Sequence, residues 1–160
     1  MALAPDFSRA SLRELSAALE RREVCSRDIV EHYLGRIGSL DGDLHAFVEV
    51  DGERALALAD AADAARNAGP VASPLHGLPI VLKDLLEVAG GKTTLGSRHF
   101  CERRSTASSA SVERLCAAGM IPLGKTHLTE FAFGGWGTNP QMGTPRNPWD
   151  REAHRVPGGS

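Results

Sequence analysis

The chain has too few cysteines, in too irregular an arrangement, for a disulfide framework. It has three, Cys25, Cys101 and Cys116, an odd number at wide spacing, so we expect free thiols and a reducing cytoplasmic compartment. Its apolar runs fall far short of the roughly 20 residues that span a bilayer. The opening segment 1–6 lacks the charged and apolar regions of a signal peptide. We therefore expect no membrane association.

An excess of one charge sign is also missing. The formal net charge is −2, from 18 basic and 20 acidic residues, which gives no electrostatic reason to propose direct nucleic-acid binding. The histidines never approach the close pairing of a metal-binding helix or finger, so we expect no metal and no cofactor. They are His32, His45, His76, His99, His127 and His154.

The first third of the chain predicts helices joined by one extended segment. Ser11 and Glu14 have the spacing of a capping box, and Ser26 is placed to cap a second helix. Residues 45–50 look extended. An alanine-rich helix follows over residues 51–67, and we expect Gly69 before Pro70 to end it with a left-handed cap.

After residue 70 the pattern changes to alternating strand and helix, which predicts an α/β fold with a mixed sheet covered by helices. We expect a short buried strand over residues 78–82, a helix over 111–118 closed by Gly119, and a strand over 120–123. Glycines and prolines from residue 133 onward predict a region built of loops, where binding sites usually lie.

Two segments suggest chemistry. Lys83 ends an apolar run, so burial should lower its pKa toward the range in which a lysine accepts a proton. Pro157-Gly-Gly-Ser160 places a serine after a glycine pair, which lets the backbone approach a ligand. Lysine and serine can act as base and proton relay. Taken alone, Lys83 could equally extend its ammonium to water, and Gly-Gly-Ser could be a linker.

One motif points to a different class of protein. The segment from Gly119 to Thr126, with Gly124 and Lys125, has the spacing of a phosphate-binding P-loop. A P-loop lies between a strand and a helix, whereas here a helix ends at Gly119 and a strand follows it. Pro122 also lacks one of the amides that a phosphate needs. We therefore expect no nucleotide site.

Taken together, several segments resemble the amidase signature family. They are His76-Gly-Leu-Pro-Ile-Val-Leu-Lys-Asp84, Gly124-Lys-Thr-His-Leu-Thr-Glu-Phe131, Asn147-Pro-Trp-Asp150 and Pro157-Gly-Gly-Ser160. The resemblance implies an α/β amidase fold and a Ser-Ser-Lys triad that acts through an acyl-enzyme.

Residue by residue, the resemblance makes Lys83 the base and Ser160 the relay serine, and it places Phe133, Gly134 and Gly135 at the substrate pocket. Asp84 and Glu130 would support the site through caps or ion pairs. The nucleophilic serine would follow Ser160, so residues 1–160 are expected to be the N-terminal part of a single amidase domain that is cut inside its serine-rich signature and is inactive alone.

Three functions remain open at this stage. They are an amidase acting on a small-molecule linear amide, the amidase subunit of a tRNA-dependent amidotransferase, and a nucleotide-binding or non-catalytic fragment. The nearly neutral charge mildly favours the first of these. A homodimer also stays open.

Overall fold

The structure, a computed structural model, describes residues 6–155. It consists of helices and a small mixed sheet, and it divides into two compact units that interleave along the chain. Within the described range, unit 1 holds residues 6–36, 51–80 and 114–123, and unit 2 holds residues 37–50, 81–113 and 124–155. That residues 1–160 belong to one domain stays a prediction.

Helix α1, Leu12–Glu20, begins at the predicted capping box. The Ser11 Oγ atom accepts a hydrogen bond from the Glu14 amide at 3.3 Å, and the Glu14 carboxylate accepts one from the Ser11 amide at 2.7 Å. These bonds satisfy amides that a helix start leaves without partners. They also lower the pKa of the Glu14 carboxyl.

Helix α2, Ser26–Leu44, begins differently from the prediction. Ser26 is the first helical residue and not the cap. Instead the Cys25 Sγ atom accepts the Asp28 amide at 3.4 Å, while the Asp28 carboxylate accepts the Cys25 amide at 3.0 Å. The Ser26 hydroxyl is turned inward and buried, where it has no hydrogen-bond partner among the described residues.

Helix α3, Gly52–Ala68, starts after Asp51, whose carboxylate accepts the Arg54 amide at 3.3 Å. It ends before Gly69 as expected, but the predicted left-handed cap is wrong. Gly69 has φ 167°, which is extended, because the ring of a following proline disfavours helical angles in the residue before it.

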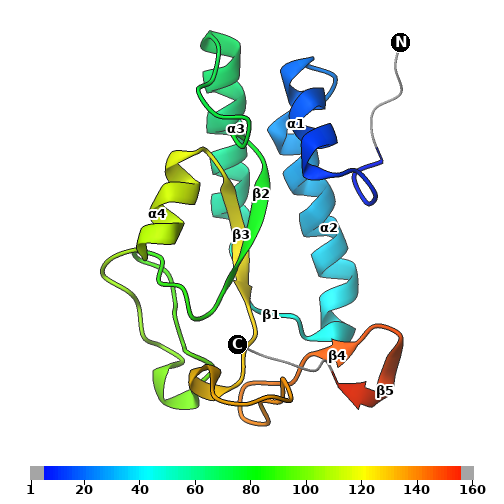
Figure 1. Cartoon of the computed structure of the whole chain (residues 1–160), viewed down its shortest axis with the longest axis vertical. Helices are drawn as coiled ribbons and strands as arrows, with labels where there is room; N and C mark the ends of the chain where they lie inside the picture. The colour runs from blue at the N-terminus through cyan, green and yellow to red at the C-terminus, as the bar shows by residue number, and fades with distance from the viewer. Residues whose placement is uncertain (1–5, 156–160) are drawn as a thin grey trace. The chain divides into compact units, whose positions relative to one another are not determined.

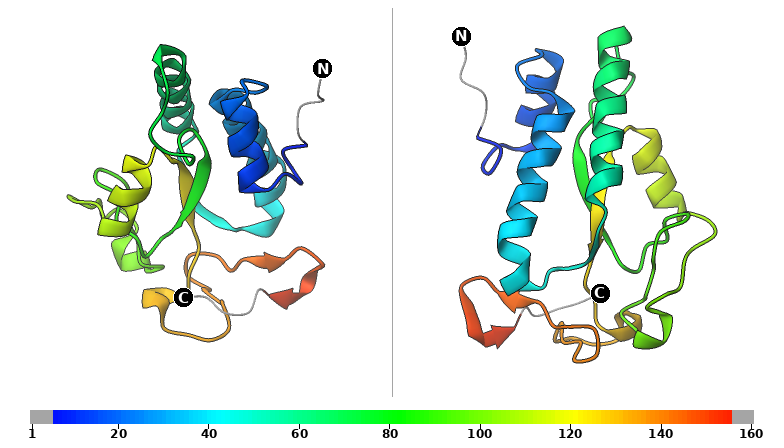
Figure 2. Two further views of the ribbon diagram at one scale, coloured as in Figure 1. Left: turned by 45° about the horizontal axis from the view of Figure 1, so that its top comes forward. Right: turned by 180° about the vertical axis from the view of Figure 1, so that it is seen from behind.

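Within unit 1, α3 is tied to the start of α2. The Asp63 carboxylate accepts the amides of Ser26 at 2.7 Å and of Arg27 at 3.0 Å. The view from behind in Figure 2 shows the two helices side by side. A side chain of one helix therefore serves as the N-terminal cap of another.

The three-stranded sheet has the order β1-β3-β2. Strand β1 is Phe47–Val50, β2 is Pro79–Lys83 and β3 is Ile121–Thr126. Strand β1 is antiparallel to β3, with a register shift between Phe47 and Glu49. The predicted strands are confirmed, although β3 continues past Leu123 to Thr126. The predicted burial of the strand over residues 78–82 is wrong in part, because Val81 is 44% exposed.

The other strand pair is parallel. The Ile121 amide donates to the Leu78 carbonyl at 2.9 Å, and the Asp84 amide donates to the Thr126 carbonyl at 3.0 Å. Strands β2 and β3 therefore run in the same direction. Parallel neighbours need a crossover, and it contains α4, Ala110–Ala117. Gly119, at φ 84°, closes the turn after α4 as predicted.

Unit 2 is largely built of loops, as the glycines and prolines predicted. It contains two short 3₁₀ turns, η1 at Arg98–Phe100 and η2 at Glu130–Ala132. An antiparallel hairpin of β4, Arg146–Asn147, and β5, Asp150–Arg155, follows and is drawn in orange and red in Figure 1.

The two units have different interiors. Unit 1 has an apolar core of Leu15, Leu19, Ile29, Leu78 and Met120. Of the ten buried polar or charged residues in the described range 6–155, nine lie in unit 2 and one, Ser26, lies in unit 1. Those nine are Asp84, Thr93, Thr94, Ser97, Ser105, Lys125, His127, Thr129 and Asn139. Because buried polar groups need specific partners, unit 2 is where a precisely arranged site can form.

Candidate active site

Lys83, the predicted base, is the last residue of β2 and is partly buried. Burial lowers the pKa of its ammonium below the ordinary value of 10.5, because a charged group loses hydration when it is covered. None of residues 6–155 forms a hydrogen bond or ion pair with this ammonium. The predicted direction of the pKa shift is confirmed, and the role of Lys83 as base stays a prediction.

Asp84 follows Lys83 and is fully buried. Its carboxylate pairs with the Lys125 ammonium at 3.1 Å. It also accepts the Thr94 amide at 3.1 and 3.2 Å, and the Thr94 hydroxyl. The expected ion pair of Asp84 is therefore confirmed, while its support of the site stays a prediction.

The P-loop-like segment is used for internal contacts. Lys125 lies within β3 and is 5% exposed, and its ammonium also donates to the Lys92 carbonyl and the Thr93 hydroxyl, each at 3.2 Å. At Gly124 a Cβ would lie 2.2 Å from the Glu49 carbonyl oxygen, so this glycine lets β1 and β3 approach closely. Lysine and glycine are both committed to packing, which excludes a phosphate cradle at this motif.

Glu130 lies at the start of η2, where its carboxylate accepts the Ser97 hydroxyl at 2.6 Å. The next two residues, Phe131 and Ala132, have φ values of 54° and 57°. Left-handed angles in residues other than glycine cost about 1–3 kcal/mol each and cluster at functional sites. Glu130 thus anchors the entry to a strained turn.

That turn leads into the predicted substrate-binding residues. The Phe133 side chain is 93% exposed. A Cβ on Gly134 would lie 3.4 Å from a Thr129 methyl group, and one on Gly135 would meet nothing within 4 Å. Within the described residues no hydrogen bond joins this loop to Lys83. Its substrate-binding role stays a prediction, as does the role of Ser160, which lies outside the described residues.

His127 was missed by the sequence analysis, which considered histidines only as metal ligands. Its side chain is 8% exposed, and its Nδ1 atom has no hydrogen-bond partner among residues 6–155. Burial is the largest cause that lowers the pKa of the imidazole, and the positive charge of Lys83 adds to the effect, against the carboxylates of Asp41 and Asp84. The His127 imidazole therefore lies within the electrostatic range of the predicted base. No spacing of residues in the sequence predicts that His127 is buried near Lys83.

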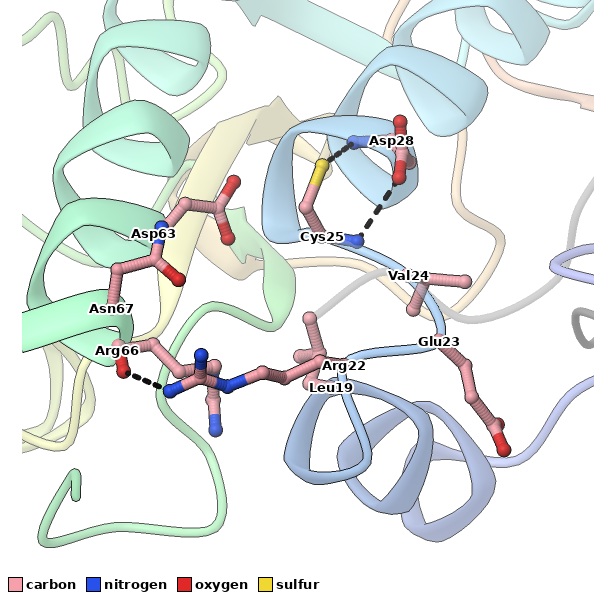
Figure 3. A pocket seen from close by; sticks show the side chains of 9 residues that line it. All are labelled: Leu19, Arg22, Glu23, Val24, Cys25, Asp28, Asp63, Arg66 and Asn67. Carbon is pink, nitrogen blue, oxygen red and sulfur yellow. Dashed lines mark hydrogen bonds between the residues drawn. The ribbon is translucent and has the colours of Figure 1, made fainter. Parts of the chain in front are cut away.

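A pocket of about 340 Å³ lies in unit 1 and contains none of the predicted site residues. Figure 3 shows Arg22 lying across it and donating to the Arg66 carbonyl, at 3.3 Å. Its lining consists of Leu19, Arg22, Glu23, Val24, Cys25, Asp28, Asp63, Arg66 and Asn67.

No group of three or more histidine, cysteine, aspartate or glutamate side chains in residues 6–155 is arranged to hold a metal ion. No helix in the same range is long and apolar enough to cross a bilayer.

The chain is similar to a curated protein of Burkholderia mallei that is one subunit of the enzyme glutamyl-tRNA(Gln) amidotransferase. They are 48% identical over 150 residues, which cover 94% of this chain and 29% of the relative. The chain thus spans about a third or less of the curated relatives that it matches.

Solved structures show the same fold. The native peptide amidase of Stenotrophomonas maltophilia superposes with a TM-score of 0.84 at 32% identity, over 91% of this chain and 31% of that one. A chain of a vestigial protein complex, described as revealing the evolutionary origins of an s-triazine catabolic enzyme, superposes with a TM-score of 0.88 at 35% identity. The match covers 94% of this chain and 33% of that one.

The Amidase family model matches residues 28–160, a range that includes every predicted site residue. With the α/β fold that the chain shares with the amidase structures, this match shows that the chain belongs to the Amidase family, as its resemblance to amidase signature sequences implied.

Proposed function

We propose that this chain supplies the base and the proton relay of an enzyme that hydrolyses a linear carboxylic amide to a carboxylate and ammonia or an amine. The observation that carries the proposal is Lys83, whose pKa is lowered by burial and whose ammonium has no partner among the described residues. Lys125, in contrast, is paired with Asp84 inside the fold. A lowered pKa makes a lysine give up its proton more readily, and the deprotonated amine can then accept a proton as a general base.

In the proposed mechanism, a serine C-terminal to Ser160 attacks the amide carbonyl carbon. Its proton passes to the Ser160 oxygen, and the Ser160 proton passes to the Lys83 nitrogen. The tetrahedral intermediate collapses as the C–N bond breaks, and the same relay returns a proton to the leaving nitrogen. Water then attacks the acyl-enzyme by the same route, which releases the carboxylate and restores the serine.

The loop of Phe133, Gly134 and Gly135 is proposed to line the substrate pocket. Its glycines leave backbone amides and carbonyls uncovered, and Gly135 has open space where a side chain would lie. Backbone amides and carbonyls at such glycines can hydrogen-bond a planar amide substrate. The exposed ring of Phe133 would supply apolar contact area.

A second candidate is the amidase subunit of a tRNA-dependent amidotransferase. The 48% identity with the glutamyl-tRNA(Gln) amidotransferase protein exceeds the 35% and 32% identities with the two solved structures above. In this case the same lysine and serine would release ammonia from an amide donor, and the ammonia would be consumed on glutamyl-tRNA(Gln). The chemistry at Lys83 is common to both candidates.

The test is an amide-hydrolysis assay on the full-length protein that contains this chain, with Lys83→Ala. Loss of a general base should lower kcat by about 10²–10⁴-fold, while circular dichroism stays native. Arg98→Ala, which removes an exposed cation of unit 2, is the matched control and should keep activity. Retention of activity within a few-fold by Lys83→Ala would overturn the proposal.

The two candidates are separated by the fate of the nitrogen. A stand-alone amidase releases ammonia or amine from simple amides at full rate without other proteins. An amidotransferase subunit should need its partner subunits, and glutamyl-tRNA(Gln) should be converted to its amide when they are present.

A further inference from the structure

We propose that the buried ion pair between Asp84 and Lys125 acts as a positioning device for Lys83, an inference that rests on the function proposed above. The lysine that gives the chain its P-loop-like appearance would then serve the amidase site indirectly. It would hold the residue next to the base, without touching substrate.

The geometry begins with the alternation of side chains along a strand. Neighbouring residues point to opposite faces, so Asp84 turns into unit 2 while Lys83 stays partly exposed on the other side. The Asp84 amide also donates to the Thr126 carbonyl at 3.0 Å. Backbone and side chain therefore fix position 84 together, and the Cα of Lys83 lies one peptide away.

The pair is satisfied on every side by named groups. The carboxylate receives the Lys125 ammonium, the Thr94 amide and the Thr94 hydroxyl. The ammonium in turn has the Lys92 carbonyl and the Thr93 hydroxyl as further acceptors. Because both charges are buried, neither can move without losing a partner that water does not replace.

The pair also ties the base to the centre of the sheet. Lys125 belongs to β3, the middle strand, where its backbone lies opposite Glu49 of β1 in the antiparallel register. An apolar pair of similar volume would give comparable stability, because burying charges costs about what their attraction returns. Apolar contacts have no preferred direction, however. We therefore attribute the directional pair of Asp84 and Lys125 to its placement of Lys83, and not to a contribution to the stability of the fold.

The decisive variant is Asp84→Asn with Lys125→Met in the full-length protein, because a single substitution would leave one group buried without its partner. We expect this double variant to fold with a lowered unfolding midpoint, because the Lys92 carbonyl and the Thr93 hydroxyl lose their lysine donor. Its kcat on the best amide substrate should fall by at least about tenfold, because small displacements of a catalytic group are costly. KM should change by less than about twofold, since substrate contacts are kept.

A folded double variant with wild-type kcat would overturn the inference. If the double variant does not fold, Thr94→Val decides, because it is nearly isosteric. It removes the hydroxyl bond to Asp84 and also the bond that the same hydroxyl accepts from the Gly96 amide. A lowered kcat at unchanged KM supports the inference, and an unchanged kcat overturns it.

The matched control is Glu102→Gln, which breaks the surface ion pair of Glu102 with Lys92 in the same unit. Glu102 is 80% exposed, and its loss should leave both kcat and KM unchanged. Lys83→Ala keeps the two proposals apart. If that variant is active, the proposed function fails, whereas an inactive Lys83→Ala beside an unaffected double variant refutes only the positioning role.

Discussion

The side-chain amide of Asn139 donates to the Gly96 carbonyl oxygen at 2.6 Å and to the Leu128 carbonyl oxygen at 3.0 Å. Asn139 is 2% exposed. Gly96 has φ 67°, and a Cβ there would lie 2.9 Å from the Leu128 oxygen, so the close approach requires glycine. The bond to Leu128 holds together the two ends of segment 128–139, and this segment includes the proposed substrate loop.

Replacing Asn139 by alanine should therefore weaken substrate binding as well as stability. The substitution leaves two buried carbonyl groups without donors and removes the acceptor for the Met142 amide. We expect a loss of about 1–3 kcal/mol in the free energy of unfolding, measured by urea denaturation, and a raised KM. Asn67→Ala, on the exposed surface of α3, is the control. A KM equal to that of the wild type would show that the loop does not contact substrate.

The pH dependence of catalysis follows from Lys83, which accepts a proton only when neutral. Burial lowers its pKa below 10.5, so kcat/KM should rise with pH and level off below that value. The free energy of unfolding should also rise with pH. The folded state disfavours the charged form, so stability is gained as pH rises from the depressed pKa of the folded state toward the ordinary 10.5 of the unfolded state. Lys83→Met should remove this gain, as thermal unfolding at a series of pH values would reveal. If kcat/KM kept rising with pH up to the ordinary lysine pKa, a base whose pKa is lowered by partial burial would be contradicted.

Local sequence predicted the parts of the fold that depend on neighbours along the chain. The capping box of Ser11 and Glu14 needs residues only three apart, and the structure has it. The cap at Ser26 failed because two contacts from elsewhere decided it. Asp63 takes the Ser26 amide, and the space occupied by the Ser26 hydroxyl exists only because Gly77 lacks a Cβ, which would lie 2.1 Å away.

The candidate site divides in the same way. Lys83 could be identified because an apolar run and a family resemblance surround it in the sequence. Its support could not, because Asp84 and Lys125 are 41 residues apart and meet only once β2 and β3 are neighbours. Likewise, the burial of His127 beside Lys83 depends on the sheet and not on any spacing between histidines.

Gly119 should tolerate no side chain. It has φ 84°, and a Cβ would lie 2.4 Å from the His76 Nδ1 atom and 2.9 Å from the His76 Cα. The His76 Nε2 atom is itself hydrogen-bonded to the Ala62 carbonyl at 3.1 Å, so the ring cannot swing away freely. Gly119→Ala should destabilise the protein by about 2–4 kcal/mol, from a left-handed alanine and an overpacked contact together.

The control for this prediction is Gly38→Ala. Gly38 lies within α2, and its added Cβ would meet nothing within 4 Å. That variant should be stabilised by about 0.4–1 kcal/mol, because alanine restricts the unfolded chain. Equal unfolding midpoints for the two variants would disprove the crowding inferred at Gly119.

Cys25 should be an unreactive thiol although it lines a pocket. Burial is the main cause that raises its pKa to about 11, and the hydrogen bond with Asp28 adds to it. Since only the thiolate is alkylated, a shift from the ordinary 9.0 should slow its reaction with iodoacetamide near pH 8 by about a hundredfold. Peptide mass spectrometry on the native protein should find the exposed Cys116 modified long before Cys25. In urea the three cysteines should react at similar rates, and rapid native modification of Cys25 would show that its cap on α2 opens readily.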